Sequence, residues 1–463
     1  MSQPVSDQSV LQAYEPIHAR EVVSYGLGDA GFNLYWAPLS AFMMVYLSDV
    51  VGLSLASIAS LLVTMRLISA VADPIFGAIA DRTHTPYGRY RPWFLWLALP
   101  LASAGILFFS LGSLAIEERL TATYISLILL NLIYTAANTA YNALSGVITL
   151  DSDQRGLIIS ARFGGAFLSA AVITWATPKL VALAGRGNHA LGWQFVMTVF
   201  GVIVAGILVN LFLQTRERLA LSSQPNRNPL RDIGNLFANR PWTILFAFGF
   251  AMQFAFMLHT AMTPYFMKVC IGRPDLIVGF VMTFTLGLAA GSASAAALTR
   301  WLPRQWLIAL AMTVAGASSL ALYACPSNQT VLMFALEAIT GAAFGMASTL
   351  AFVMCADTAD YNAWKTGHRA TAMTYSMIMF GKKIGAAASA ALIGAVLAGY
   401  AANSLLTQHV LGHIRALISL TPAAICFGAA GIIALYDLTP DRVVKLQAQL
   451  LSSVRGKSSN PLP

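Results

Sequence analysis

The amino-acid sequence predicts an all-α polytopic membrane protein with twelve transmembrane helices in two six-helix halves. Of the 463 residues, 57% are hydrophobic and only 10% are charged, whereas a soluble domain has about 25% charged residues. Twelve apolar stretches follow one another, each long enough for the roughly 20 residues that cross a bilayer as a helix. One long basic connection divides them six and six. With a mean hydropathy of +0.68, the chain leaves no room for a separate soluble enzyme domain.

The first residues do not have the pattern of a cleaved signal peptide. Residues 1–22 are polar, carry Glu15, Arg20 and Glu21, and have no apolar core. Gly and Ala are plentiful in the stretches that follow, which allows close helix packing in lipid; a β-barrel would show shorter alternating segments. The predicted spans are 24–49, 56–80, 93–113, 121–149, 157–183, 191–214, 242–266, 275–298, 306–325, 330–356, 371–400 and 412–436.

Lysine and arginine predict the orientation of these spans. If the N-terminus is cytoplasmic, 18 of these residues fall on the inner side, six on the outer side and four inside spans. Cytoplasmic connections are enriched in Lys and Arg, so both termini are expected inside, in the cell (inner) membrane. The same pattern explains the formal net charge of +9, because the basic residues lie between apolar runs. We therefore expect the lipid bilayer as a partner and no nucleic acid.

The long basic connection sets the expected domain organisation. Residues 1–214 form an N-terminal six-helix half, 215–241 a cytoplasmic central loop, 242–440 a C-terminal six-helix half and 441–463 a cytoplasmic tail. Two six-helix halves joined by a basic loop are the layout of a secondary transporter that is built from repeats.

Motifs of other membrane-protein classes are missing from the sequence. It contains no GxxxxGKS phosphate loop, no HExxH and no GxSxG motif. The four cysteines form neither a CxxC pair nor a metal-binding pattern, and we interpret them as reduced packing residues. We therefore expect no enzyme activity, no cofactor and no bound metal.

Charged residues inside a bilayer are costly and usually functional. Arg66, Ser69 and Asp73 are spaced by three and four, so they share one face of the second span, which must look into the bundle. The competing interpretation is that Asp73 only pairs with Arg66. Asp29, Glu337 and His259 also lie within spans; Asp29 could cap or pair near the end of the first one, and His259 is interpreted as a structural hydrogen-bonding residue.

The fourth span carries a polar face. Thr135, Asn138 and Asn142 are again spaced by three and four, and Tyr141 lies beside them. Amides donate and accept hydrogen bonds, so they suit ligands rich in hydroxyl groups. The alternative is hydrogen bonding between helices, worth about 0.6 kcal/mol per contact. Aromatic side chains that could stack on the apolar face of a ligand ring are Trp36, Tyr141, Trp175, Phe254, Tyr265 and Tyr375, although most aromatic residues here are expected to pack or to lie at the membrane interface.

The stretch 72–93, ADPIFGAIADRTHTPYGRYRPW, is the most specific feature. Pro86 and Gly88 favour a tight turn between the second and third spans. Positive-inside topology explains the arginines but not the acidic Asp81. We therefore predict an inner gate in which charges of this loop pair with cytoplasmic groups of the other half. The gate residues are Asp81, Arg82, Arg89, Arg91 and, in the next inward connection, Arg155.

With three other stretches, this segment resembles the glycoside–pentoside–hexuronide:cation symporters, the melibiose-carrier branch of the major facilitator superfamily. The other stretches are YGLGDAGFN (25–33), ITLDSDQR (148–155) and DTADYNAWKTGHRATAMTYS (357–376), the last followed by FGKKIGAA (380–387). Their order and spacing fit over nearly the whole chain. The resemblance implies the major facilitator fold, with two six-helix halves around a central cavity.

The resemblance also implies roles for single residues. Asp73 matches a cation-site carboxylate and Thr135 a cation-site hydroxyl, and Lys383 matches a lysine close to that site. Ser69 and Ala72 stand where melibiose-type members have a second carboxylate and an amide. One carboxylate is a poor cage for sodium but can carry a proton, so H+ is favoured over Na+. Arg66 and Lys383 are expected to tune the pKa of Asp73.

The sugar site implied by the resemblance comprises Asn33, Asn138, Tyr141, Asn142 and Arg162. Asn33 and Asn138 replace two sugar-binding carboxylates, and Asn142 replaces a stacking Trp for which Tyr141 could partly substitute. Because Arg162 remains while those carboxylates are gone, one hypothesis is an anionic substrate such as a uronide, unless Asp29 or Glu337 cancels the excess positive charge.

The sequence thus predicts a secondary active transporter that imports a small-molecule sugar, glycoside or uronide in symport with a cation, by alternating access. Binding one ligand must favour the other for the two to be coupled. Two alternatives stay open: a carrier of lysolipids or other amphiphiles with the same fold, and a membrane sensor that transports nothing.

Overall fold

The computed structural model describes residues 16–149, 151–218, 229–367, 370–401, 408–439, 442–447 and 449; the side chains of a few helical residues in these ranges, Arg66 included, lie outside the description. All elements in this part of the chain are helices joined by turns. The chain divides into two compact units. The first contains the described residues up to Pro229 and the segment that ends at Ser376, and the second contains Leu230–Gly367 and the described residues from Met377 onward.

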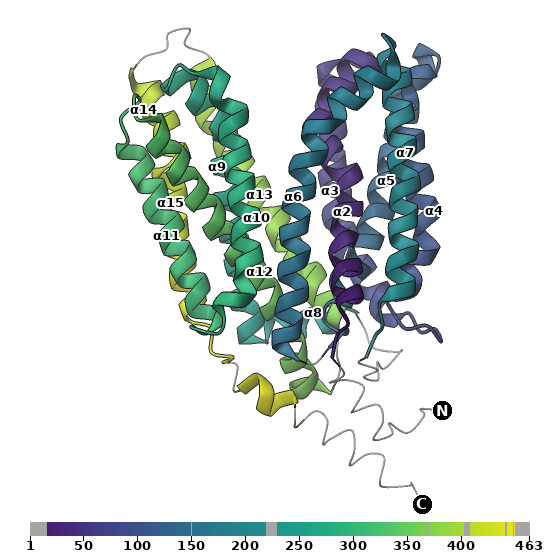
Figure 1. Ribbon diagram of the computed structural model, residues 1–463, viewed down its shortest axis with the longest axis vertical. Helices are drawn as coiled ribbons and strands as arrows, with labels where there is room; N and C mark the ends of the chain where they lie inside the picture. The colour runs from purple at the N-terminus through teal and green to yellow at the C-terminus, as the bar shows by residue number, and fades with distance from the viewer. Residues whose placement is uncertain are drawn as a thin grey trace, which may run out of the picture. The chain divides into compact units, whose positions relative to one another are not determined.

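The first unit is a bundle of long helices (Figure 1). Polar side chains begin several of them, because the first N–H groups of a helix need acceptors. The Ser54, Asp151 and Asn188 side chains each accept a hydrogen bond from a backbone amide two or three residues on. The helices are α2 (Ala19–Val45), followed by the π-helical turn η1 (Tyr46–Val50), α3 (Leu55–Arg82), α4 (Arg91–Phe108), the 3-10 turn η2 (Leu111–Ser113), α5 (Ile116–Leu144), α6 (Ser152–Gly185) and α7 (His189–Gln214).

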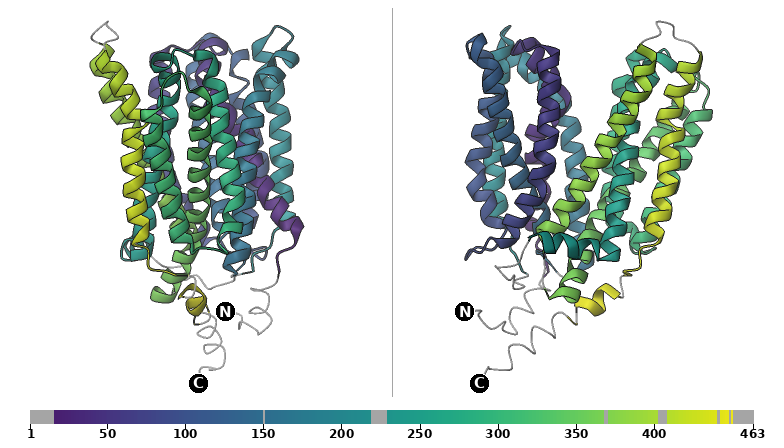
Figure 2. Two further views of the ribbon diagram at one scale, coloured as in Figure 1. Left: turned by 60° about the vertical axis from the view of Figure 1, so that its left-hand side comes forward. Right: turned by 180° about the vertical axis from the view of Figure 1, so that it is seen from behind.

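The second unit is also helical. Its helices are α8 (Pro229–Phe237), α9 (Arg240–Tyr265) with the π-helical turn η3 (Phe266–Cys270), the 3-10 turn η4 (Pro274–Leu276), α10 (Ile277–Leu298), α11 (Arg304–Ala324), α12 (Thr330–Thr366), most of α13 (Thr371–Ala401), α14 (Gln408–Ile418) and α15 (Leu420–Ala434). Figure 2 shows α14 and α15 following each other along one side of this unit. Ser419 lies between the two helices.

Small residues set the closest helix packing in the second unit. Gly287 and Gly291 on α10 face Gly341 and Gly345 on α12. A Cβ atom added to Gly291 would lie 1.9 Å from the Ala342 carbonyl oxygen, which no side chain tolerates. Two GxxxG pairs therefore bring the backbones of α10 and α12 together, as expected for helices that associate in lipid.

Eleven helices in the described residues are long and apolar enough to cross a membrane. They correspond to the predicted spans from the second to the twelfth. The predicted first span, 24–49, lies in α2 and η1 but is not among the eleven. Its Gly, Tyr, Asp29 and Asn33 residues lower the hydropathy, although α2 packs on α6 and α7 like the other helices. The predicted tenth span, 330–356, extends to Thr366 in α12.

Candidate functional site

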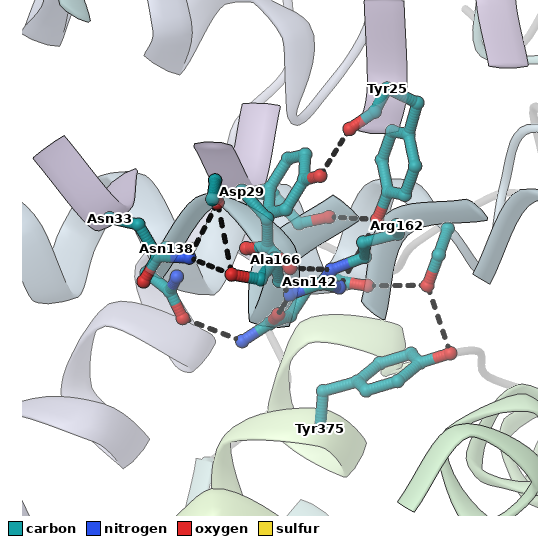
Figure 3. Close-up of polar contacts among 11 residues, drawn as sticks. Tyr25, Asp29, Asn33, Asn138, Asn142, Arg162, Ala166 and Tyr375 are labelled. Carbon is teal, nitrogen blue, oxygen red and sulfur yellow. Dashed lines mark hydrogen bonds and ion pairs between the residues drawn. The ribbon is translucent and has the colours of Figure 1, made fainter. Parts of the chain in front are cut away.

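A buried ion pair lies at the centre of the polar face of the first unit (Figure 3). The Arg162 side chain on α6 donates from Nε to Asp29 Oδ2 on α2 at 2.6 Å and from Nη2 to Asp29 Oδ1 at 3.3 Å. Only 4% of the Arg162 side chain and 11% of the Asp29 side chain are exposed. This two-pronged contact joins α2 to α6 and matches the arginine's charge with a carboxylate.

The asparagines of α5 continue this network. Arg162 Nη2 also donates to Asn142 Oδ1 at 2.8 Å, and Asn142 Nδ2 donates to Asn138 Oδ1 at 2.9 Å. Asn138 is half-buried, and within the described ranges no group accepts a hydrogen bond from its amide nitrogen. The predicted polar face of the fourth span is thus one chain of hydrogen bonds that ends in an available donor.

Asn33 lies one turn after Asp29 on α2. Its amide nitrogen donates to the Ala166 carbonyl oxygen at 2.7 Å and to Ser169 Oγ at 3.2 Å, both on α6. This donor therefore holds α2 against α6. The side chain is half-buried, so its carbonyl oxygen is the atom that could serve a ligand.

The Tyr141 ring packs against the guanidinium group of Arg162. The arginine's guanidinium carbon lies 4.3 Å from the centre of the Tyr141 ring, a cation–π contact. The ring of Tyr25 stacks on Tyr141 with centroids 4.5 Å apart, and each tyrosine hydroxyl donates to the other's backbone carbonyl. Tyr141 is fully buried. In this structure its ring therefore positions Arg162 and offers no face to a sugar, unlike the predicted stacking role.

A different aromatic pair joins an exposed ring, Trp36, to a half-buried one, Tyr134. Trp36 on α2 is 49% exposed, and its ring stacks on Tyr134 of α5 with centroids 5.5 Å apart. Tyr134 lies one turn before Asn138 on the same helix. These two rings are the better candidates for contact with the apolar face of a sugar.

Four residues of this site were not among the predicted site residues. They are Asp29, Tyr25, Tyr134 and Ser145; the Ser145 hydroxyl donates to the Tyr375 hydroxyl at 3.1 Å. A periodic signal was present: Tyr25, Asp29 and Asn33 are spaced by four, so they share one face of α2. The same spacing rule that identified the polar face of α5 applies to α2.

The predicted coupling residues lie on several helices. Asp73 on α3 is 5% exposed and Thr135 on α5 is also buried, and these two helices pack together. Ser69 is half-buried on α3, whereas the Arg66 side chain lies outside the described residues. Lys383 lies on α13 within the second unit. In that unit its neighbour Lys382 lines a largely apolar pocket between α9, α12 and α13, together with Phe248, Met252, Ser348, Phe352 and Cys355.

Asp81 is buried at the end of α3 and accepts three hydrogen bonds. The donors are the Tyr90 hydroxyl at 2.6 Å and the backbone amides of Ala372 and Met373, each at 2.9 Å. The two amides belong to the first turn of α13, so the carboxylate meets the positive end of that helix. Burial and the Asp81 charge hold the pKa of Tyr90 well above 10, so its hydroxyl remains a donor.

Three of the predicted gate arginines donate hydrogen bonds to backbone carbonyl groups. Arg91 donates to the Phe212 carbonyl at 2.6 Å, Arg155 to Thr149 at 2.9 Å and Arg82 to Ala78 at 2.9 Å. All these bonds stay inside the first unit. They satisfy carbonyl groups at helix ends, which need donors.

The loop between α3 and α4 is built around Glu217. Its carboxylate accepts from the backbone amides of Arg89, Tyr90 and Arg91 at 2.8–2.9 Å. Gly88 has a φ of +112°, and a Cβ atom there would lie 2.5 Å from Glu217 Oε1. The glycine is required both by its conformation and by the close carboxylate. The sequence interpretation of 215–241 as a loop did not identify this contact.

Residues 24–440 match the sequence model of one protein family, described as MFS/sugar transport protein. The chain belongs to this family. The predicted resemblance to the melibiose-type branch of the major facilitator superfamily is confirmed, and the protein is a multi-pass membrane transporter rather than an enzyme.

Relatives cover nearly the whole chain. It is 30% identical to the inner membrane symporter YicJ of Escherichia coli K12, over 95% of this chain and 96% of that protein. It is 27% identical to the isoprimeverose transporter of Lactiplantibacillus pentosus, over 94% and 91%. It is 26% identical to the glucuronide carrier protein homolog of E. coli K12, over 94% and 98%.

The fold is also that of solved transporters. The structure of the proton:xylose symporter XylE superimposes with a TM-score of 0.67 at 14% sequence identity, covering 93% of this chain and 98% of that one. The predicted all-helical major facilitator fold is thereby confirmed.

Proposed function

We propose that this MFS/sugar transport protein imports a neutral sugar or glycoside together with a proton, by alternating access. The observation that carries the proposal is the pairing of Arg162 with Asp29, continued by Asn142 and Asn138. This group has donors and acceptors but no excess charge. Amides and a neutralised arginine suit the hydroxyl groups of a sugar, and the nearby Trp36 and Tyr134 rings suit its apolar face.

The ion pair argues against the hypothesis of an anionic substrate. That hypothesis rested on an excess of cations over carboxylates in the site. Asp29 compensates Arg162 through two hydrogen bonds. In the second unit, Glu337 lies against His259. A uronide would have to displace Asp29 from a buried arginine, which is costly because a buried carboxylate would lose its partner.

Coupling is proposed to run through Asp73. The carboxylate is buried on a helix that faces the bundle, and a buried carboxylate that binds a proton loses its charge and its desolvation cost. Ser69 and Ala72 leave the position without the further carboxylate and amide that the resemblance associates with sodium. Thr135, Arg66 and Lys383 complete the proposed set.

The proposed location is the inner membrane, with both termini in the cytoplasm. The 18 to 6 distribution of Lys and Arg supports this orientation, and the relative YicJ is an inner membrane symporter. In this orientation, Asp81 and the loop around Glu217 lie on the cytoplasmic side, where we propose that they hold the inner gate with Arg82, Arg89, Arg91 and Arg155.

The test is uptake of radiolabelled sugars, glycosides, uronides and a lysolipid into proteoliposomes, with pH and sodium gradients imposed separately. We expect uptake of a neutral sugar or glycoside that follows an inward proton gradient. In competition, neutral ligands should displace it at least tenfold better than the matching uronides, about 1.4 kcal/mol. Preference for uronides would restore the anionic hypothesis, lysolipid uptake would support the amphiphile carrier, and no accumulation of any probe would support a sensor.

Asp81→Asn tests the proposed gate. The asparagine keeps the shape but loses the charge that meets the first turn of α13 and replaces one acceptor oxygen with a donor that faces N–H groups. We expect the carrier to spend more time open to the cytoplasm. A cysteine introduced as Asn138→Cys, in a variant without native cysteines, should then react several times faster with a maleimide added from the cytoplasmic side. Unchanged labelling would contradict the gate and would favour the interpretation that the charges of this loop only set the topology.

A further inference from the structure

A histidine and a glutamate contact each other in the interior of the second unit, and the proposed transport site uses neither. His259 Nε2 on α9 lies 3.0 Å from Glu337 Oε1 and 3.1 Å from Oε2 on α12. Both side chains are 1% exposed. A carboxylate so deeply buried requires hydrogen bonds to be tolerated at all.

The other ring nitrogen also meets an acceptor. His259 Nδ1 lies 3.3 Å from the backbone carbonyl oxygen of Ile418, the last residue of α14. In a continuous helix this oxygen would accept from the N–H group four residues later. That residue is Pro422, which has no N–H. The histidine therefore faces a carbonyl group that the broken helix leaves in need of a donor.

Two acceptors around one imidazole determine how many protons the group holds. A neutral imidazole has a single N–H and cannot donate to both sides. Both contacts are hydrogen bonds only when the pair holds one additional proton, either on the ring as imidazolium beside a carboxylate or on Glu337 as a carboxylic acid beside a neutral ring. Without that proton, a nitrogen lone pair faces either the carboxylate or the carbonyl oxygen.

We propose that His259, Glu337 and the Ile418 carbonyl form a buried proton-binding site that joins α9, α12 and α14, separate from the transport site proposed at Asp73. The bound proton completes two hydrogen bonds between three helices. The site lies entirely within the second unit.

Few other charges face this site. Within their bounds, α10 and α15 contain no Asp, Glu, Lys, Arg or His; α10 contributes Phe284, whose ring centre lies 5.2 Å from that of His259. On α14, Arg415 donates to Ser327 and His413 is exposed, and Lys268 of η3 is exposed. Apolar side chains that include Leu258, Met262, Ile414 and Leu417 cover the surroundings. Glu337 is therefore the acidic partner of the histidine.

Glu337→Gln removes the need for the additional proton but keeps the hydrogen bonds of the site. The glutamine amide can donate to Nε2 of a neutral imidazole, while Nδ1–H donates to Ile418, so every contact is satisfied without an extra proton. An unfolded chain releases the histidine proton above about pH 6.5, but the folded wild-type site retains it. Wild-type stability must therefore fall as pH rises, by up to tenfold in the unfolding equilibrium per pH unit while the site stays protonated.

The measurement is the thermal midpoint of the detergent-purified full chain from pH 6.5 to 8.5. We expect the wild-type midpoint to fall relative to that of Glu337→Gln. Asp49→Asn should keep the wild-type slope, because its carboxylate is exposed and lies in the first unit. If wild type and Glu337→Gln have parallel curves, the proposal is wrong. Should Glu337→Gln not fold, His259→Gln/Glu337→Gln takes its place, since two amides can also donate and accept, and the same comparison decides.

Discussion

Arg162→Gln is expected to abolish substrate binding and to destabilise the protein by about 3–5 kcal/mol, the usual cost of removing one partner of a buried ion pair. The substitution leaves the Asp29 carboxylate buried without its cation, and Asn142 loses the donor that orders it. Thermal unfolding in detergent measures the loss of stability, and binding of the labelled substrate measures the loss of binding.

The control is Asp29→Asn/Arg162→Gln, in which two neutral amides face each other. We expect this double variant to recover much of the lost stability, because no unpaired charge remains, but not to bind substrate. If the double variant binds like the wild type, the pair serves only the packing of α2 against α6. If Arg162→Gln is as stable as the wild type, the ion pair does not stabilise the protein.

Asp73→Asn is expected to abolish accumulation of substrate against its gradient while exchange of substrate across the membrane persists. An asparagine has the shape of the aspartate but cannot take up and release a proton, so the proton gradient can no longer drive the sugar. The measurement compares uphill uptake with counterflow in proteoliposomes. Asp49→Asn, at an exposed carboxylate of the same unit, is the control for loss of a carboxylate elsewhere.

Coupling to sodium in place of protons would give a different result. If uptake depends on sodium at a constant proton gradient and Asp73→Asn abolishes that dependence, Asp73 belongs to a sodium site despite Ser69 and Ala72. Loss of both uphill uptake and counterflow would instead place Asp73 in substrate binding or in the packing of α3 against α5.

Local patterns in the sequence were sufficient for the helices and for one face of the site. Apolar runs of about 20 residues identified eleven spans that the structure also has, because hydropathy acts over a single helix. The spacing of Asn138 and Asn142 placed them on one face of α5, where they contact each other at 2.9 Å. The family resemblance, carried by four contiguous motifs, was confirmed over residues 24–440.

Helix ends and partners depended on more than hydropathy. The polar composition of α2 lowers its hydropathy, yet the helix packs on α6 and α7. The sequence predicted the arginines of the 82–91 stretch as gate charges, and it did not identify the bond from Arg91 to the Phe212 carbonyl, which forms because the end of α7 comes within reach. Asp81 meets backbone amides of α13, a partner that carries no charge in the sequence.

The sequence by itself determined the membrane class, the family, the helical segments and the polar face of α5, since each depends on composition or on spacing within one segment. Only the tertiary structure decided the charge of the site. Asp29 and Arg162 are 133 residues apart, and His259 and Glu337 are 78 apart. No spacing rule reaches across such separations; helix packing alone brings these side chains within 3 Å or so and turns an apparent excess of positive charge into a neutral pair.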